Sequence, residues 1–378
     1  MNLLLHDKYR PTSLAGLDFA PDVSAFLKAL KDHDLPHMIM EGCRGSGKSL
    51  RTLLFLQEKF GPFTIKNITL DIDIPGKTDQ KDINIMVSPY HYQINPSTHS
   101  FYDRMLIKAF TSEVLKYKIL TGISYRILII EDADLLTREA QESLRRILEL
   151  YISTCRFIFL VNNEGHLIDP LYSRCVKVRV PAPTDDQVLT ILRKISVGEQ
   201  VLMPEGILAD ITRHSQRNIN KAIGFLERYI LRHGSESVFA PFKRDEYDDT
   251  YSIAVRIVQT VIAGTDIAST IEEMRSLIYE LITFCMDARY IIPTLLEIAL
   301  ERIPKRNTEQ LYGLCQFAAV RDYTIRYSSK QIYHVESFCI YLFDLIKNIM
   351  VQKAVKAEKA EKAEKAVKRV VKDKAVTV

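Results

Sequence analysis

The chain has 378 residues, 47% of them apolar, and a formal net charge of +4, a size that predicts two or three domains. Nine Lys or Arg residues stand against four Asp or Glu over 351–378, so the rest of the chain sums to about −1 and offers nucleic acid no general electrostatic attraction. Charges interrupt the apolar runs before they reach membrane-spanning length, and the six cysteines form no CxxC pair, so we expect a soluble intracellular protein with reduced cysteines and neither a zinc site nor a disulfide framework.

Strand-like and helix-like segments alternate in the first half of the chain, which is typical of a parallel sheet with helices on its faces. A short buried strand is predicted at 37–40, and alternating apolar residues on either side of Pro75-Gly76 predict a half-exposed hairpin. Continuous apolar runs at 126–130 and 156–161 predict central strands. Between them, helical spacing over 137–151, with a threonine placed to cap its start, predicts an amphipathic helix.

Helical patterns replace strand patterns further along the chain. The sequence Thr-Asp-Asp-Gln at 184–187 fits a capping box that opens an amphipathic helix. Polar, proline-containing sequence at 234–250 predicts a linker, and helical spacing over 271–350 predicts a separate helical domain. The Ala-Glu-Lys repeats within 351–378 have too few apolar groups to pack, so we expect an exposed, disordered basic tail that can be transiently helical through its Glu and Lys pairs. The alternative is a solvated appendage with no specific role.

A glycine-rich loop follows the first predicted strand and precedes a helix-like segment. It fits the P-loop pattern GxxxxGK(S/T) with the residues Gly42, Cys43, Arg44, Gly45, Ser46, Gly47, Lys48 and Ser49. Its glycines let successive backbone N–H groups turn toward phosphates at a helix N-terminus, Lys48 meets the β- and γ-phosphate oxygens, and Ser49 can ligate Mg²⁺. The sequence therefore predicts that this loop binds a nucleoside triphosphate; the alternative is a degenerate loop kept only for structure.

The apolar run at 126–130 leads directly into the acidic residues Glu131, Asp132 and Asp134. This is the form of a Walker B strand, which carries carboxylates to the metal beside a P-loop. Hydrolysis at such sites needs one carboxylate that holds Mg²⁺ and a second that orients the attacking water. Glu131 and Asp132 are therefore the candidate catalytic acids, with Glu131 as the metal ligand that accompanies Ser49.

Further motifs extend from the start of the chain to about residue 350. They are Asp7-Lys8-Tyr9-Arg10-Pro11, Leu35-Pro36-His37, Asn95-Pro96-Ser97, Asp103-Arg104, Leu144-Arg145-Arg146, Ser173-Arg174-Cys175, Val180-Pro181-Ala182-Pro183 and Ile332-Tyr333-His334-Val335-Glu336. Together with the P-loop and the Walker B strand, they resemble the small subunits of replication factor C, the eukaryotic clamp loader of the AAA+ class. The resemblance is strongest to the subunit type numbered three in human and five in yeast, and it leaves out the tail.

The resemblance implies an architecture, cofactors and partners. The implied domains are an α/β P-loop AAA+ domain over 1–182, with a parallel sheet between two helical layers, an all-α lid over 183–240, an all-α collar over 241–350 and the tail over 351–378. ATP and Mg²⁺ are the implied cofactors, with Tyr9, Arg10 and Pro11 also at the nucleotide. The implied partners are sister subunits of a hetero-oligomeric ring, a sliding clamp and primer-template DNA, in the nucleus or, for a viral protein, in the replication compartment of the infected cell.

The resemblance also gives roles to two polar residues. Arg174, in the Ser-Arg-Cys motif, would complete the ATP site of a neighbouring subunit, where a guanidinium neutralises charge that develops on the γ-phosphate. Asn162, at the end of the strand after Walker B, would polarise the attacking water or the γ-phosphate. The alternatives are an arginine in a surface salt bridge and an ordinary asparagine at the end of a strand.

Two departures from the family pattern bear on hydrolysis. Active members carry Asp-Glu-Ala-Asp where this chain has Glu131 and Asp132 in the opposite order, so the metal-binding carboxylate gains a methylene and the water-orienting carboxylate loses one. A displacement of a catalytic group by about 1 Å can lower the rate about a hundredfold. The sensor 2 arginine of the family aligns with Asn220, and Lys221 would point about 100° away on a helix. We therefore expect this chain to bind ATP and to hydrolyse it weakly at its own site.

The sequence offers candidate residues for DNA contacts and allows two alternative functions. Lys116, Lys118 and Arg138 are candidates for phosphate contacts, though each could be plain solvated charge. One rival function is a self-sufficient AAA+ remodelling ATPase that works as a homo-oligomer. The other is a scaffold subunit of the ring that binds no nucleotide.

Overall fold

A computed structural model describes most of the chain. The described residues are 4–72, 81–96, 102–116, 125–201, 203–234, 241–264, 266–284, 286, 288–303, 308–325, 328 and 330–348. The chain divides into two compact units, Met1–Phe242 and Lys243–Val378. The division of the first unit at residue 182 stays a prediction, and the predicted tail over 351–378 lies outside the described residues.

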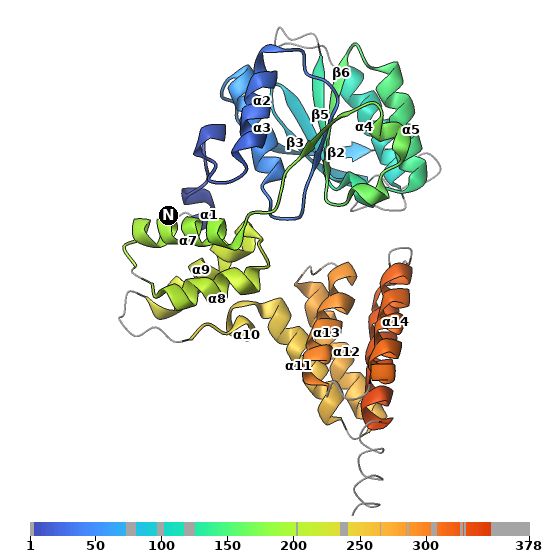
Figure 1. Ribbon diagram of the computed structural model, residues 1–378. Coiled ribbons are helices and arrows are strands. Elements are labelled where there is room, and N and C mark those ends of the chain that lie inside the picture. The colour runs from blue at the N-terminus through green and yellow to red at the C-terminus, as the bar shows by residue number, and fades with distance from the viewer. Residues whose placement is uncertain are drawn as a thin grey trace, which may run out of the picture. The chain divides into compact units, whose positions relative to one another are not determined.

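The first unit is built on a seven-stranded sheet in the order β2-β3-β4-β5-β6-β1-β7 (Figure 1). The strands are β1 Met38–Glu41, β2 Lys66–Ile72, β3 Lys81–Val87, β4 His91–Ile94, β5 Arg126–Ile130, β6 Cys155–Val161 and β7 Val176–Arg179. The five strands from β4 to β7 in that order are parallel, while β2 and β3 form an antiparallel pair at the edge. The predicted parallel strands and hairpin are therefore confirmed.

Helices cover both faces of this sheet, as the fold prediction required. The helices of the first unit are α1 Leu5–Lys8, α2 Pro21–Ala29, α3 Lys48–Phe60, α4 Asp103–Lys116, α5 Arg138–Leu150, α6 Asp169–Tyr172, α7 Asp185–Gly198, α8 Glu205–Ser215 and α9 Ile219–His233. Figure 1 shows α2 and α3 on one face and α4 and α5 on the other. In β5, Ile127 and Ile129 pack into the core beside α3, whereas Leu128 and Ile130 pack into the core beside α4 and α5. Burial on both faces explains why this strand is apolar at every position.

Side-chain caps fix the beginnings of two predicted helices. The Thr137 hydroxyl accepts a hydrogen bond from the Ala140 N–H at 3.3 Å at the start of α5. At the start of α7, Thr184 and Gln187 form the reciprocal capping box that the sequence predicts. Each cap satisfies backbone donors that the helix itself leaves free and stabilises the helix by about 1 kcal/mol.

The second unit is helical in its described residues. Its helices are α10 Arg244–Tyr247, α11 Asp249–Ala263, α12 Ile267–Thr283, α13 Ala288–Arg302, α14 Thr308–Ile325 and a last helix over 332–348. They enclose one apolar core in which Ile257, Leu295 and Phe338 are fully buried. None of the described helices is both long and apolar enough to cross a membrane. The described cysteines are free thiols, while Cys285 lies outside the described residues.

The predicted linker at 234–250 is wrong for its second half, and residues 235–240 lie outside the described residues. Residues 241–250 contain α10 and the start of α11, because Tyr247 is buried and the Asp248 carboxylate caps α11 by accepting from the Tyr251 N–H at 3.2 Å. The linker was predicted from polar composition, and these polar residues act as helix caps and ion-pair partners instead.

Candidate nucleotide-binding site

The P-loop, Glu131, Asp132 and Asn162 meet where three neighbouring parallel strands end. In the sheet, β6 lies between β5 and β1, so their carboxyl ends share one edge. The P-loop follows β1, Glu131 follows β5 and Asn162 follows β6. A cavity of about 480 Å³ opens at this edge. Its walls include Arg44, Gly45, Gly47, Lys48, Ser49, Glu131, Asp132 and Asn162.

The backbone of the P-loop has the conformation that its glycines predict. Gly45 and Gly47 have φ angles of +79° and +75°, in the left-handed region that residues with a Cβ atom rarely adopt. A Cβ atom on Gly42 would lie 2.3 Å from the Val180 carbonyl oxygen, so only glycine fits where the loop leaves β1. The Ser46 hydroxyl is fully buried and has no hydrogen-bond partner among the described residues. The loop therefore contains a buried polar atom whose hydrogen-bonding capacity the described residues leave unsatisfied.

The ammonium group of Lys48 points into the loop. It donates to the carbonyl oxygens of Gly42 at 2.5 Å and Cys43 at 2.9 Å, and to Asn162 Oδ1 at 3.0 Å. Lys48 is 8% exposed, and this burial lowers its pKa, while the nearby carboxyl groups of Asp132 and Asp134 act in the opposite direction. Its hydrogen-bond partners are neutral oxygens, so a phosphate in the cavity would give this buried cation a charged partner.

Asp132 is held at the same end of the cavity by three neutral or cationic donors. Its oxygens accept from Asn162 Nδ2 at 2.8 Å and Asn95 Nδ2 at 3.3 Å, and Arg44 Nη2 lies 3.5 Å away. Its φ angle of +45° is unusual for a residue other than glycine, although aspartate tolerates it better than most. This backbone turn directs the Asp132 carboxylate toward Asn162, the residue that also contacts Lys48.

Glu131 faces a different partner. Its Oε1 accepts a hydrogen bond from Gln93 Nε2 at 2.6 Å, and burial raises the pKa of the Glu131 carboxyl although the Gln93 donor opposes that shift. The two acids therefore diverge, with Asp132 beside the Lys48 and Asn162 network and Glu131 beside the end of β4. Sequence reasoning missed Gln93, because β4 is a short strand of mostly polar or amphipathic residues (His-Tyr-Gln-Ile) and only the sheet order brings it beside β5.

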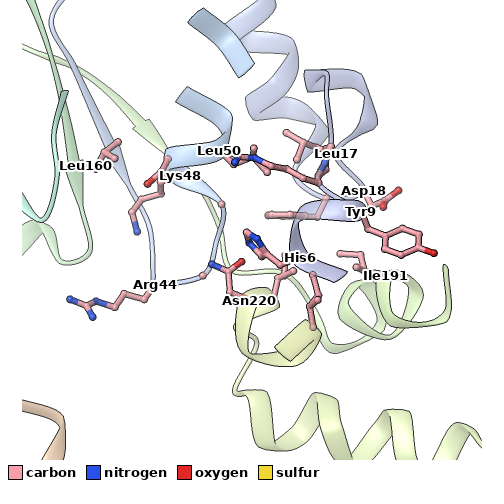
Figure 2. Close-up of a pocket in the computed structure, with 18 of the residues that line it drawn as sticks. His6, Tyr9, Leu17, Asp18, Arg44, Lys48, Leu50, Leu160, Ile191 and Asn220 are labelled. Atoms are coloured by element: carbon pink, nitrogen blue, oxygen red, sulfur yellow. The ribbon is translucent and has the colours of Figure 1, made fainter. Parts of the chain in front are cut away.

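The opposite wall of the cavity comes from the N-terminal segment and from α7 and α9. Tyr9, Arg10 and Pro11 line it, together with the apolar residues Leu17, Phe19, Ile191, Ile195 and Ile223. Figure 2 shows Lys48 and Arg44 at one end of the cavity, Tyr9 at the other, and Asn220 between Arg44 and His6. Asn220 lines the cavity and Lys221 does not, so a neutral amide lies at the position that the resemblance assigns to sensor 2.

The N-terminal segment is attached to the helices of this opposite wall. The Leu5 N–H donates to Glu227 Oε1 on α9 at 3.1 Å, and Lys8 Nζ donates to Glu199 Oε1 at 2.6 Å, just after α7. The Tyr9 ring packs so closely on Gly198 that a Cβ atom there would lie 2.3 Å from its hydroxyl. The residues at the apolar end of the cavity therefore form one packed group.

These residues fit a nucleotide with a metal ion. Cationic and amide groups at one end suit a triphosphate, and apolar side chains at the other suit a base and sugar. Ser49, Glu131 and Asp132 offer hydroxyl and carboxylate oxygens, the ligands that Mg²⁺ prefers. Within the described ranges no group of three or more His, Cys, Asp or Glu residues could hold a metal by itself. A magnesium ion at this site would depend on phosphate oxygens for part of its coordination, as is usual for this metal.

Arg174 does not line this cavity. It follows α6, and its Nη1 donates to the Pro170 carbonyl oxygen at 2.8 Å while Nη2 lies 2.8 Å from Glu149 Oε1 on α5. Its side chain is 38% exposed. The structure therefore places Arg174 at the surface in a salt bridge, where it is available to another chain and not to this chain's own nucleotide. Its predicted role in a neighbouring site stays a prediction.

The candidate DNA contacts are placed only in part. Arg138 is exposed at the first position of α5. Lys118 and the side chain of Lys116 lie outside the described residues. Their contribution to DNA binding therefore stays a prediction.

Comparison with known proteins identifies the family. Residues 251–350 match the family model described as Replication factor C subunit 3, C-terminal domain. Replication factor C subunit 3 of Homo sapiens is 30% identical over 354 residues, which cover 91% of this chain and 96% of that protein. Replication factor C subunit 5 of Saccharomyces cerevisiae is 29% identical over 350 residues, 88% of this chain and 96% of that protein.

A third relative resembles the chain in sequence to the same degree, and one solved structure resembles it more weakly. The probable replication factor C subunit 3 of Dictyostelium discoideum is 31% identical over 347 residues, 89% of this chain and 96% of that protein. Among solved structures, the Thermotoga maritima RuvB Holliday junction branch migration motor has a TM-score of 0.45 and 16% identity, over 68% of this chain and 80% of that chain. Because relatives at about 30% identity share nearly their whole length with it, the chain belongs to the replication factor C subunit family.

Proposed function

We propose that this chain is an ATP-binding small subunit of a hetero-oligomeric clamp loader, which opens a ring-shaped sliding clamp and loads it onto primed DNA during replication. The observation that carries the nucleotide part is the buried Lys48 ammonium, held by Asn162 beneath a P-loop that forms the floor of a cavity of about 480 Å³. The subunit part rests on the family relatives over nearly the whole chain. A nuclear location, or a viral replication compartment for a viral protein, would follow from this role.

The residues of the cavity have distinct tasks in nucleotide binding. The N–H groups of the loop and Lys48 bind the phosphates, and Ser49 with Glu131 holds the metal. Bound Mg²⁺ would supply positive charge that neutralises part of the phosphate charge. Tyr9, Arg10 and Pro11 close the end of the cavity that suits the base. Asn162 is hydrogen-bonded to both Lys48 and Asp132, so it connects the phosphate-binding lysine with one of the two candidate catalytic acids.

Weak hydrolysis at this site follows from the order of the two acids. The longer Glu131 side chain is held by Gln93, and the shorter Asp132 side chain is the one beside Asn162. We expect the double variant Glu131→Asp with Asp132→Glu, in the assembled ring, to raise hydrolysis at this site by up to about a hundredfold, because both carboxylates regain their usual reach. Single-turnover hydrolysis of ATP bound to this subunit measures the change.

The matched control is a Glu-to-Asp substitution away from the site. Glu142→Asp lies on the exposed face of α5 and keeps the natural pair intact, so hydrolysis at this site should not change. A double variant no faster than the natural chain would show that the acid order does not limit this site. Rapid hydrolysis by the natural chain alone would favour a self-sufficient ATPase.

The clamp-loader function itself is tested by reconstitution. The chain is combined with sister subunits of replication factor C, a sliding clamp and primer-template DNA, and ATP-dependent transfer of the clamp to the DNA is followed by energy transfer between labelled clamp and labelled primer. We expect loading only when this chain is present. Equal loading by an assembly that lacks it would remove the proposal.

A further inference from the structure

Glu149 stands beside the arginine that is proposed to act on a neighbouring subunit. It lies in the last turn of α5, and its Oε1 is 2.8 Å from Arg174 Nη2 and 3.5 Å from Arg145 Nε. The three side chains are 38 to 45% exposed. One carboxylate oxygen therefore serves as the counter-ion for two arginines at the surface of the first unit.

The contacts of Arg174 occupy the end of its side chain that would meet a phosphate. Nη1 donates to the Pro170 carbonyl oxygen at 2.8 Å and to the Ser173 hydroxyl at 3.2 Å, and Nη2 faces Glu149. A backbone carbonyl and a hydroxyl are neutral acceptors that can remain in place. Among the described residues Glu149 is the one anionic partner of Arg174, so an incoming anion competes with Glu149 and with neither of the other two contacts.

We infer that Glu149 is a specificity-determining residue, a resident carboxylate that the γ-phosphate of ATP on the adjacent subunit must displace from Arg174. The inference rests on the proposed function of Arg174. A terminal phosphate carries a charge of roughly −2 and three acceptor oxygens, so it outcompetes a single carboxylate for a guanidinium. ADP has no γ-phosphate, so with ADP on the neighbour Arg174 remains with Glu149.

Arg145 makes this exchange reversible at low cost. When Arg174 turns to the phosphate, Glu149 keeps Arg145 as a counter-ion one helical turn away on α5. The carboxylate is then not left alone at an interface from which water is excluded, where an unpaired charge is strongly unfavourable. The surface also suits a protein partner, because Leu150 and Ile152, which follow Glu149 in sequence, are 72% and 60% exposed.

The charge of Glu149 can be removed without changing its size. In the reconstituted assembly, Glu149→Gln should tighten ATP binding at the adjacent subunit about two- to fivefold, the range expected for an exposed ion pair, and leave ADP binding unchanged. Titration with ATP and ADP analogues measures both affinities. The gain should shrink as salt is raised, because salt screens exposed pairs, whereas a loss of packing would not depend on salt.

Two further variants separate the outcomes. Glu142→Gln removes a carboxylate on the exposed face of the same helix that pairs with no other described residue, and it should change neither affinity. In the Arg174→Ala background the effect of Glu149→Gln should disappear, because the competing group is gone. Unchanged or weaker ATP binding in Glu149→Gln, or the same gain without Arg174, would overturn the inference. If Arg174→Ala by itself leaves the neighbouring site unaffected, the proposed function of Arg174 fails instead.

Discussion

Arg174→Ala should lower hydrolysis at the adjacent subunit's ATP site by roughly 10³- to 10⁵-fold, the effect of removing an arginine that stabilises charge on a transferring phosphoryl group. The reason lies in the placement of Arg174, which is partly exposed outside this chain's cavity and held by an ion pair with Glu149 that an anion can replace. The measurement is single-turnover hydrolysis in a ring where only that adjacent site has a functional P-loop.

A control variant must show that the loss of activity comes from the role of Arg174 at the adjacent ATP site and not from the loss of a surface charge. Arg193 is a matched control, since its side chain is 51% exposed and pairs with Glu205 at 2.6 Å on the helices that follow the sheet. Arg193→Ala should leave the rate within about twofold, as expected for an exposed ion pair. A rate for Arg174→Ala equal to that of Arg193→Ala would mean that Arg174 is an ordinary surface residue.

Lys48→Ala should weaken binding of ATP to this chain by roughly 10²- to 10³-fold. The change removes the buried cation that would pair with phosphate oxygens, and losing one partner of a buried charge pair typically costs about 2–5 kcal/mol. It also removes the hydrogen bond to Asn162 at 3.0 Å, so the link between the P-loop and Asp132 is broken. Equilibrium titration of the full chain with a fluorescent ATP analogue and Mg²⁺ measures the loss.

Lys28→Ala provides the comparison for this titration. Lys28 is exposed on α2 and does not line the cavity, so its removal changes the net charge equally and should leave the affinity intact. Equal, weak signals from the natural chain and from Lys48→Ala would favour a ring scaffold that binds no nucleotide.

Features that depend on neighbours in sequence could be predicted. The P-loop is carried by consecutive residues, and the caps at Thr137 and Thr184 join groups three residues apart, so local spacing contains the required information. The apolar run of β5 predicts burial on both faces for the same reason. These elements were found where the sequence places them.

Features that depend on tertiary arrangement could not. The contact of Gln93 with Glu131 requires β4 to lie beside β5, and the salt bridge of Arg174 with Glu149 joins residues on separate helices. The left-handed backbone at Asp132 is likewise set by its surroundings, because an aspartate in sequence gives no sign of its φ angle. The sequence therefore indicates that both acids belong to the site, but it does not show that Glu131 contacts Gln93 while Asp132 contacts Asn162.

The most direct test is a structure of the reconstituted assembly with Mg²⁺ and a non-hydrolysable ATP analogue. We predict a triphosphate on the loop at 42–49 within hydrogen-bonding distance of Lys48 Nζ, and Arg174 turned from Glu149 to the γ-phosphate held by the adjacent subunit. A cavity without nucleotide, together with Arg174 still paired to Glu149 and facing solvent, would contradict the proposed role of this subunit.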